Sequence, residues 1–221
     1  MAEAKGFRIF DKVLKPAECA ALAARLEFCR SRSRAGARHL MALPEVARVA
    51  QDERLRALAR AASGADAVPF RATLFAKTGR ANWLVVWHQD TALPLVKRFD
   101  APDWESWSEK EGAHYAHAPA WALQRVVALR LHLDASTADN GPLRVIPASH
   151  TRGVLTDEEI KLAVAAQTAV ECHVPAGGVL LMRPLLLHAS SKARADAPRR
   201  VLHIEYADAL HLADNIRLAI C

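Results

Sequence analysis

The sequence predicts a β-rich α+β fold in which N-terminal helices buttress a sheet. Apolar residues at helical spacing fill the first part of the chain, and short β-rich runs separated by turn residues fill the rest. There is no internal repeat and no low-complexity linker. A chain of 221 residues fits a single domain, which we expect to span 1–221, with a helical buttress at 1–66 and a β core at 67–221.

Composition excludes several classes of protein. Hydrophobic residues make up 52% and charged residues 24%, as in globular rather than disordered or fibrous chains. The net charge of +6 could suggest nucleic acid, but Lys and Arg are scattered, with no aromatic residues interleaved. The N-terminus lacks the apolar core of a signal peptide, and no run has the length of a membrane span. We therefore expect a cytoplasmic protein with no nucleic-acid or membrane partner.

Neither the cysteines nor the densest basic cluster indicates a site. The 4 cysteines lie far apart with no Cys-x-x-Cys pair, which favours reduced structural thiols over a zinc finger or a disulfide framework. Arg30, Arg32, Arg34 and Arg38 lie near the end of an expected helix, where cations suit the helix dipole and solubility. A docking patch for an anionic substrate is the alternative.

Two helices are expected before residue 66. Residues 15–29 have apolar residues at helical spacing, and Pro16 suits a first turn. Residues 44–62 form a second apolar-periodic stretch, which ends at the Ser63-Gly64 signal that follows many helices. Both helices are expected to lie against the sheet.

Short β-rich runs follow Asp66, and two of them, residues 68–76 and 83–87, flank a turn at Thr78 and Gly79. The other expected elements are strands at 124–134, 143–146, 170–174, 179–187 and 199–206 and a helix at 157–166. Residues 97–119 have no clean period and are too long for an ordinary loop, which is typical of a functional lid. A surface excursion packed on the helices is the alternative.

Polar and apolar residues alternate in the strand expected at 124–134. Leu129 and Leu131 fall on one face, and Arg130 and His132 fall on the other. The alternation predicts that the polar face of this strand contacts water.

A metal site is indicated by Trp87-His88-Gln89-Asp90 at the end of a strand. Residues two apart in an extended chain point to the same side, so His88 and Asp90 can reach one point. His188 ends the apolar run GVLLMRPLLLH and supplies a third ligand. Two histidines and one carboxylate form the facial arrangement of non-haem Fe(II) oxygenases. A structural zinc site would close its fourth position, usually with sulfur, and no cysteine lies near these histidines in sequence.

A His-x-Asp match alone is weak evidence for a metal site in a chain with 10 histidines, and Arg199 strengthens it. Arg199 opens the strand that follows His188, where a guanidinium could clamp a dicarboxylate in bidentate fashion. Arg200 is the competing residue. Strand alternation places one of the two inward, and the spacing favours Arg199.

Over most of its length the chain resembles the phytanoyl-CoA dioxygenase (PhyH) family of Fe(II)/2-oxoglutarate-dependent oxygenases. The resemblance rests on FAKTGRANWLVVWHQD, LRLHLDASTADNGPLRVIPASH, GGVLLMRPLLLHASS and PRRVLHIEYA. It implies a double-stranded β-helix, a cupin-like jelly roll, in which His88, Asp90 and His188 hold iron. It also implies that Arg199 binds the far carboxylate of 2-oxoglutarate.

The resemblance implies further residues of the cosubstrate pocket. Lys77 and Asn82 precede the His-x-Asp motif at positions that look like pocket residues, and the strand face bearing Arg130 and His132 lies near the site. Halogenating relatives lack the carboxylate ligand, so the presence of Asp90 implies a hydroxylase. The chain departs from longer family members mainly in its brevity, so its substrate is not implied by name.

These inferences predict a dioxygenase that uses Fe(II), 2-oxoglutarate and O2 to hydroxylate an unactivated carbon of a small organic or acyl substrate, releasing succinate and CO2. Desaturation or cyclisation of the substrate could begin with the same oxidation step. The alternative is a cupin-like metal-dependent isomerase or ligand-binding protein without oxygenase activity, which would not need Arg199.

The remaining histidines and the tryptophans have ordinary structural interpretations. Surface or hydrogen-bonded histidines without a chemical role are expected at His39, His114, His117, His150, His173, His203 and His211. The tryptophans are expected in the core, with pocket lining as the alternative, at Trp83, Trp87, Trp104, Trp107 and Trp121.

Overall fold

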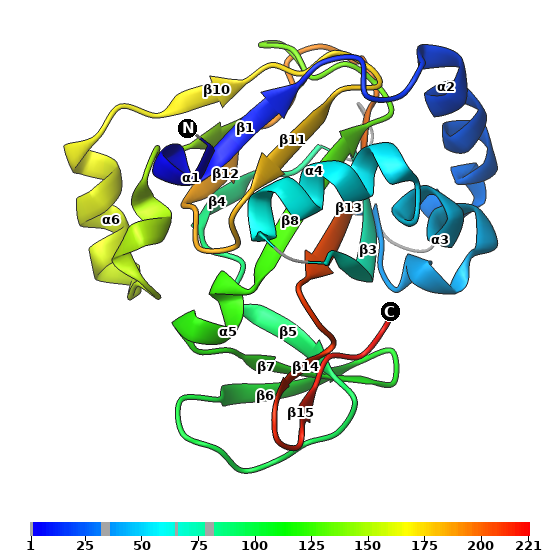
Figure 1. Ribbon diagram of the computed structural model, residues 1–221. Coiled ribbons are helices and arrows are strands. Elements are labelled where there is room, and N and C mark those ends of the chain that lie inside the picture. Colours follow the sequence, from blue (N-terminus) through cyan, green and yellow to red (C-terminus); the bar gives the residue numbers. More distant parts are fainter. Residues whose placement is uncertain (1, 32–35, 65, 78–81) are drawn as a thin grey trace.

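The structure, a computed structural model, describes residues 2–31, 36–64, 66–77 and 82–221. Its strands form several antiparallel sheets, and helices gather on one side of the largest sheet (Figure 1). This mixed, β-rich architecture is the fold class that the sequence predicts. The turn predicted at Thr78 and Gly79 lies outside the described residues, as do Arg32 and Arg34 of the basic cluster.

Two sheets make up the upper part of the molecule in Figure 1. The larger sheet has the strand order β1 (Phe7–Phe10), β11 (Val179–Met182), β8 (Val126–His132), β13 (Arg199–Ala207), β3 (Val68–Lys77) and β2 (Gly36–Ala37). The smaller sheet has the order β10 (Val170–Cys172), β9 (Leu143–Val145), β12 (His188–Ser190) and β4 (Val85–His88). Neighbours in these orders are far apart in sequence, so tertiary pairing builds both sheets.

The outer face of the larger sheet is apolar and is covered by helices. Residues paired across antiparallel strands point to the same side, so Leu74, Leu202 and Leu131 share this face. They belong to one hydrophobic cluster with residues of α2 (Pro16–Arg25), α3 (Pro44–Ala50) and α4 (Glu53–Ser63). Burial of this face fixes the register of the central strands, because a slip of one residue would expose it.

The inner face of the larger sheet carries polar residues and packs against the smaller sheet. Its apolar end, including Leu180, clusters with Val145 of β9 and Cys172 of β10. Arg130 and His132 lie on this face and are only 6% and 1% exposed. A second sheet covers this face, so neither side chain is open to bulk solvent, although Arg130 lines a cavity beside the predicted metal ligands.

The expected helix at 44–62 is two helices. α3 ends at Ala50 and α4 begins at Glu53, with Asp52 as the N-cap that accepts a hydrogen bond from the Arg54 amide (2.9 Å). α4 ends at Ser63, and the C-cap that follows it, Gly64, has a φ of 72°, the left-handed conformation that glycine adopts freely. The apolar period continues through the break, which is why the sequence reads as one helix.

The helix expected at 15–29 ends earlier, and the one at 157–166 is observed as expected. α2 stops at Arg25 and a 3-10 helix, η1 (Glu27–Ser31), follows it. α6 (Asp157–Ala166) begins with a capping box between Thr156 and Glu159. The other short helices are α1 (Ala2–Lys5), η2 (Leu40–Ala42), η3 (Ser149–Arg152) and α5 (Ala120–Gln124).

The strand expected at 179–187 is also divided. β11 ends at Met182, the chain turns through Pro184, and a new strand of the other sheet begins at His188. Proline has no N–H to donate to a sheet, which favours a break at this point. His188 therefore opens β12 instead of ending a long strand.

Residues 97–119 contain regular structure that the sequence analysis missed. β6 (Glu105–Lys110) and β7 (Ala113–His117) form a hairpin that pairs with β5 (Ala92–Leu95) in a three-stranded sheet. Trp104 and Tyr115 are buried there, and a two-stranded sheet of β14 (His211–Ala213) and β15 (Ile216–Arg217) contributes to the same core. The expectation of a long irregular segment is wrong, because β6 is mostly polar and exposed and gains its order from pairing with β7.

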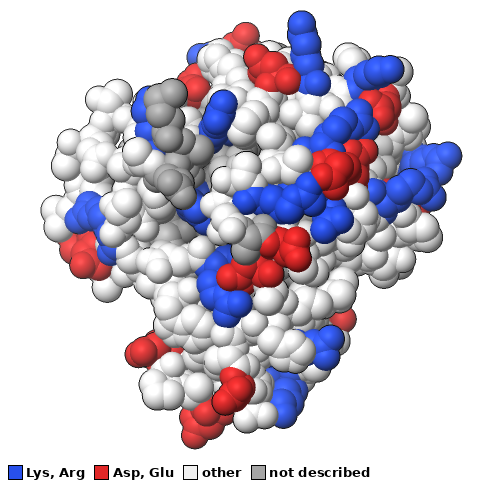
Figure 2. Space-filling model, viewed as in Figure 1, with Lys and Arg blue, Asp and Glu red and all other residues white. Residues whose placement is uncertain are grey.

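Charged residues are mixed on the surface in view. Figure 2 shows Lys and Arg interspersed with Asp and Glu. Opposite charges also form pairs, since Arg54 lies 2.8 Å from Glu18 and 2.7 Å from Asp52. Within the described part of the chain, no helix combines the length and apolar character that crossing a bilayer requires.

Candidate active site

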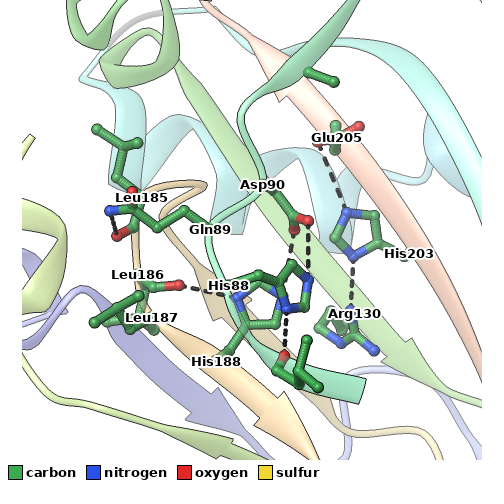
Figure 3. A network of polar contacts seen from close by, with 12 residues as sticks. His88, Gln89, Asp90, Arg130, Leu185, Leu186, Leu187, His188, His203 and Glu205 are labelled. Atoms are coloured by element: carbon green, nitrogen blue, oxygen red, sulfur yellow. Dashed lines mark hydrogen bonds and ion pairs between the residues drawn. The ribbon is translucent and has the colours of Figure 1, made fainter. Parts of the chain in front are cut away.

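Three predicted metal ligands meet at the end of the smaller sheet. His88 is the last residue of β4, His188 is the first of β12, and the two face each other in the register of these paired strands. Nε2 of His88 is 3.7 Å from Oδ1 of Asp90, and Nε2 of His188 is 3.6 Å from Oδ2 (Figure 3). One ligand atom from each residue lies within 4.8 Å of the others, a spacing that could hold a single metal ion.

Backbone carbonyls fix which ring nitrogen of each histidine is free. Nδ1 of His88 contacts the carbonyl of Val86 (2.8 Å), and Nδ1 of His188 contacts that of Leu186 (2.9 Å). A carbonyl can only accept, so Nδ1 carries the proton in both rings and Nε2 keeps its lone pair. Both Nε2 atoms face Asp90, in the form that binds a metal.

The electrostatics also favour the metal-binding protonation states. Burial lowers the pKa of His188 to about 4, against the opposing effect of the Asp90 carboxylate, so this imidazole is neutral near pH 7. Burial opposes ionisation of Asp90, but the neighbouring basic groups, His188 foremost, hold its pKa below the usual range. A neutral imidazole and an ionised carboxylate are the forms that coordinate metals.

Gln89, between two of these residues, ties together the segments that carry them. Its side-chain amide donates to the carbonyls of Gly153 (2.9 Å) and Leu185 (2.8 Å), and its oxygen accepts from the Leu155 amide (2.8 Å). The Asp90 amide donates to the carbonyl of Pro184 (2.9 Å). The His-x-Asp segment is thus bonded to the turn that leads into His188. Sequence reasoning assigned no role to Gln89.

A cavity of about 80 Å³ lies beside the three ligands. Its lining residues are Phe75, Lys77, Trp83, Val85, His88, Asp90, Arg130, Leu143, His188, Ser190 and Arg199. Arg199 lines the cavity, whereas Arg200 forms an ion pair with Asp134 (2.7 Å). Strand alternation accounts for this difference.

Ser190 connects two of the cations in the cavity. Its hydroxyl accepts from Lys77 Nζ (2.6 Å) and from an Arg199 nitrogen (3.3 Å), and donates to the Gly141 carbonyl (2.9 Å). Lys77 also donates to the Ser191 carbonyl (2.6 Å). Ser190 lies two residues beyond His188 on the same strand, so alternation from His188 could have found it.

The cavity is strongly cationic. Lys77, Arg130 and Arg199 are all buried, and among the described lining residues only Asp90 is a carboxylate. Burial, then the charges of Arg199 and Arg130, lowers the pKa of Lys77 to about 7, and burial lowers that of Arg199 to about 10. Buried cations in excess of nearby anions favour the binding of an anionic ligand.

Two residues implied by the resemblance are not part of this lining. Asn82 exchanges two hydrogen bonds with the backbone of Ala193 (2.8 and 2.7 Å), so it orders the segment that follows β12. His132 shares the inner face with Arg130 but is buried outside the cavity lining. Burial holds its pKa well below the usual range, so its ring is neutral near pH 7.

Comparison with known proteins adds a family match. The sequence model of the family Phytanoyl-CoA dioxygenase (PhyH) matches residues 2–201 of the chain. A comparison with curated protein sequences gives no match.

Solved structures show the same fold. AviO1 from Streptomyces viridochromogenes is 24% identical, with a TM-score of 0.70 over 96% of this chain and 94% of AviO1. The non-heme α-ketoglutarate-dependent epimerase SnoN from nogalamycin biosynthesis is 16% identical, with a TM-score of 0.70 over 95% of this chain and 80% of SnoN. HygX from Streptomyces hygroscopicus, with nickel and 2-oxoglutarate bound, is 18% identical, with a TM-score of 0.66 over 93% of this chain and 84% of HygX. At these identities the likeness concerns the fold, which agrees with the jelly roll that the resemblance implies.

Proposed function

Since the chain belongs to the phytanoyl-CoA dioxygenase family of Fe(II)/2-oxoglutarate-dependent oxygenases, we propose that it hydroxylates an unactivated carbon of a small organic or acyl substrate, with release of succinate and CO2. The observation that carries this proposal is the meeting of two histidines and a carboxylate beside a buried cationic cavity. The first feature suits a metal with open positions, and the second suits a dianionic cosubstrate.

The donor set fits Fe(II). His88, Asp90 and His188 would hold the ion through two neutral Nε2 atoms and one ionised carboxylate. When bound, iron supplies the oxidising chemistry with O2 and 2-oxoglutarate that inserts an oxygen atom into a C–H bond of the substrate. The residues of the chain contribute the ligand geometry, the binding of the cosubstrate and the exclusion of water.

The cavity residues fit 2-oxoglutarate at both of its ends. Arg199, with Lys77 and Ser190 beside it, would bind the carboxylate far from the metal. Arg130 would face the other end, because it lines the cavity and the charge of Asp90 acts on it, raising its pKa against the lowering effect of burial. Two anchors for two carboxylates make the cavity selective for a dicarboxylate.

The rim of the cavity supports an organic substrate. Trp83 and Val85 give the cavity lining apolar surface, which Phe75 and Leu143 extend. An apolar rim holds carbon-rich groups close to the metal position, where an unactivated carbon must lie to react. The structurally similar SnoN is an epimerase, so the product must be identified by its mass and stereochemistry.

The test has two stages. Anaerobic addition of Fe(II) and then 2-oxoglutarate should produce the weak visible metal-to-ligand charge-transfer band, and admission of O2 with a set of small organic and acyl compounds should release succinate. Mass spectrometry of the consumed compound should show one added oxygen atom. A protein that binds metal but neither consumes O2 nor releases succinate would instead be a metal-dependent isomerase or a ligand-binding protein.

A further inference from the structure

A row of buried polar side chains begins at the cavity and crosses the inner face of the larger sheet. Arg130 on β8 donates to Nδ1 of His203 on the neighbouring strand β13 (3.1 Å), and Nε2 of His203 lies 3.8 Å from Oε1 of Glu205 (Figure 3). His203 and Glu205 are 4% and 1% exposed. Sequence reasoning gave His203 no chemical role, but the structure places it directly behind a cationic residue of the cavity.

The row continues to the segment that follows the metal-binding residues. Arg71 on β3 donates two hydrogen bonds to the carboxylate of Glu205. One comes from Nε, and the other comes from Nη2, which lies 2.6 Å from Oε1. Arg71 also donates to the carbonyl of Ala92 (2.8 Å), close in sequence to Asp90. The Glu205–Arg71 pair is therefore held by the backbone beside the metal site.

The orientation of His203 is determined by its neighbours. An arginine can only donate, so Nδ1 of His203 must accept from Arg130 and the ring proton must lie on Nε2. Nε2 faces the carboxylate of Glu205, which favours this tautomer. Burial, then the charge of Arg130, keeps the pKa of His203 well below the usual range, so the ring is neutral.

Arg130 is held from two sides, with part of its guanidinium left for a ligand. Its guanidinium lies 5.1 Å from the centre of the Phe75 ring, and Phe75 in turn packs edge-on against His203. Nε of Arg130 is buried without a hydrogen-bond partner among the described residues, although Arg130 lines the cavity. A buried donor without a partner costs free energy unless a ligand accepts from it.

We propose that His203 is a positioning residue that aims Arg130 at the metal end of the cavity, where Arg130 contacts the carboxylate of 2-oxoglutarate next to the metal. Glu205, fixed by Arg71, holds His203 in the tautomer that accepts from Arg130. This inference rests on the proposed function, and it assigns to His203 an effect on cosubstrate binding that acts through Arg130 alone.

The experiment is a double-mutant cycle on 2-oxoglutarate affinity, measured anaerobically from the charge-transfer band of the Fe(II) protein. Arg130→Met should weaken binding about a hundredfold and His203→Leu about tenfold, since the latter misaligns the arginine without removing it. The double variant should bind no more weakly than Arg130→Met alone. His203→Asn should restore most of the affinity, because its amide oxygen can accept from Arg130.

Two controls separate positioning from general damage. Fe(II) affinity, measured by equilibrium dialysis without 2-oxoglutarate, should be unchanged in every variant, and His211→Leu, at an exposed histidine on β14, should leave both affinities unchanged. Additive losses in the double variant, full affinity in His203→Leu, or failure of His203→Asn to restore binding would each overturn the role of His203. Absence of the band in the unsubstituted protein would instead overturn the proposed function, and this inference with it.

Discussion

The two histidines of the site are prepared for metal binding by the chain that immediately precedes them. Each ring contacts the carbonyl of the residue two positions earlier, Val86 for His88 and Leu186 for His188. In each case the ring and the carbonyl belong to the same short segment of chain, so the contact is local. The tautomer that leaves Nε2 free is thus fixed by short-range geometry.

Single substitutions of the three ligands should abolish turnover. His88→Ala, Asp90→Ala and His188→Ala each leave two protein ligands, below the facial set, so Fe(II) affinity should fall at least tenfold and succinate release should cease. Equilibrium dialysis and a succinate assay measure the two effects, with circular dichroism to show that the fold is kept. Full iron affinity and activity in any two of the variants would reject the metal assignment.

Arg199 and Arg200 form a matched pair of neighbours on β13. Arg199→Ala should weaken 2-oxoglutarate binding by a few kcal/mol while iron stays bound, because a charge-assisted bidentate contact is lost from a buried cavity. Arg200→Ala should leave this affinity unchanged, since Arg200 pairs with Asp134. The apparent KM for 2-oxoglutarate measures both. The opposite result would mean that Arg200 binds the cosubstrate.

The affinity for 2-oxoglutarate should decrease as pH rises above about 7. The pKa of Lys77 is lowered to about 7 in the free cavity, first by burial, and a bound carboxylate favours the charged amine and raises this pKa again. Binding therefore takes up a proton above pH 7, and linkage makes the affinity fall with rising pH until the pKa of the complex is passed. Titrations at several pH values measure the slope, which Lys77→Met should flatten. An equal slope in that variant would assign the effect to another group.

At the scale of elements, the pairing of β4 with β12 brings His88 opposite His188. Both strands are short, so their ends must be fixed by other contacts. Gln89 supplies these through three side-chain hydrogen bonds of 2.8–2.9 Å to the segments at 153–155 and 183–187. The distance between the ligands therefore depends on a residue that is not a ligand.

Replacement of Gln89 by Met keeps the side-chain length and removes all three hydrogen bonds. The backbone groups left without partners should lower the free energy of unfolding by about 2–3 kcal/mol and weaken Fe(II) binding. Chemical denaturation of the metal-free protein and equilibrium dialysis measure the two effects. Gln167→Met, at an exposed residue after α6, is the control. Unchanged iron affinity in Gln89→Met would show that the two strands hold the ligands without help.

The hairpin of β6 and β7 changes what is expected of residues 97–119. β7 is paired on both sides, with β5 and β6, and its Tyr115 is buried. We expect amides of β7 to be protected from hydrogen exchange without any ligand, because their exchange requires the sheet to open. Rapid exchange of β7 that slows on addition of Fe(II) and 2-oxoglutarate would support the lid interpretation instead.

At the scale of the whole molecule, the two faces of the larger sheet differ in what they contact. The outer face packs Leu74, Leu131 and Leu202 against the helices and holds the strands in register. The inner face carries Arg130 and Arg199, which are buried because the smaller sheet covers them. The outer face contributes apolar burial, whereas the inner face also carries charged groups, whose burial costs free energy unless a ligand pairs with them.

Much of the fold and of the site could be predicted because the signals are local. The helical period of 157–166, the Ser63-Gly64 stop and the alternation around Arg130 each depend on a few neighbouring residues. The spacing of His88 and Asp90, and the alternation that separates Arg199 from Arg200, are local in the same sense. Arg199, Lys77 and Arg130 all line the cavity; their functions stay predictions.

The rest was decided by pairings between residues far apart in the chain. The sequence by itself determined most of the helices and strands and which residues could bind metal, because backbone period and side-chain chemistry are properties of short segments. Only the tertiary structure decided that the Arg130 face is buried, that 105–117 is a hairpin, and that His203 lies behind Arg130. Burial and contact depend on which strand lies alongside and which sheet lies opposite, and no local pattern specifies either.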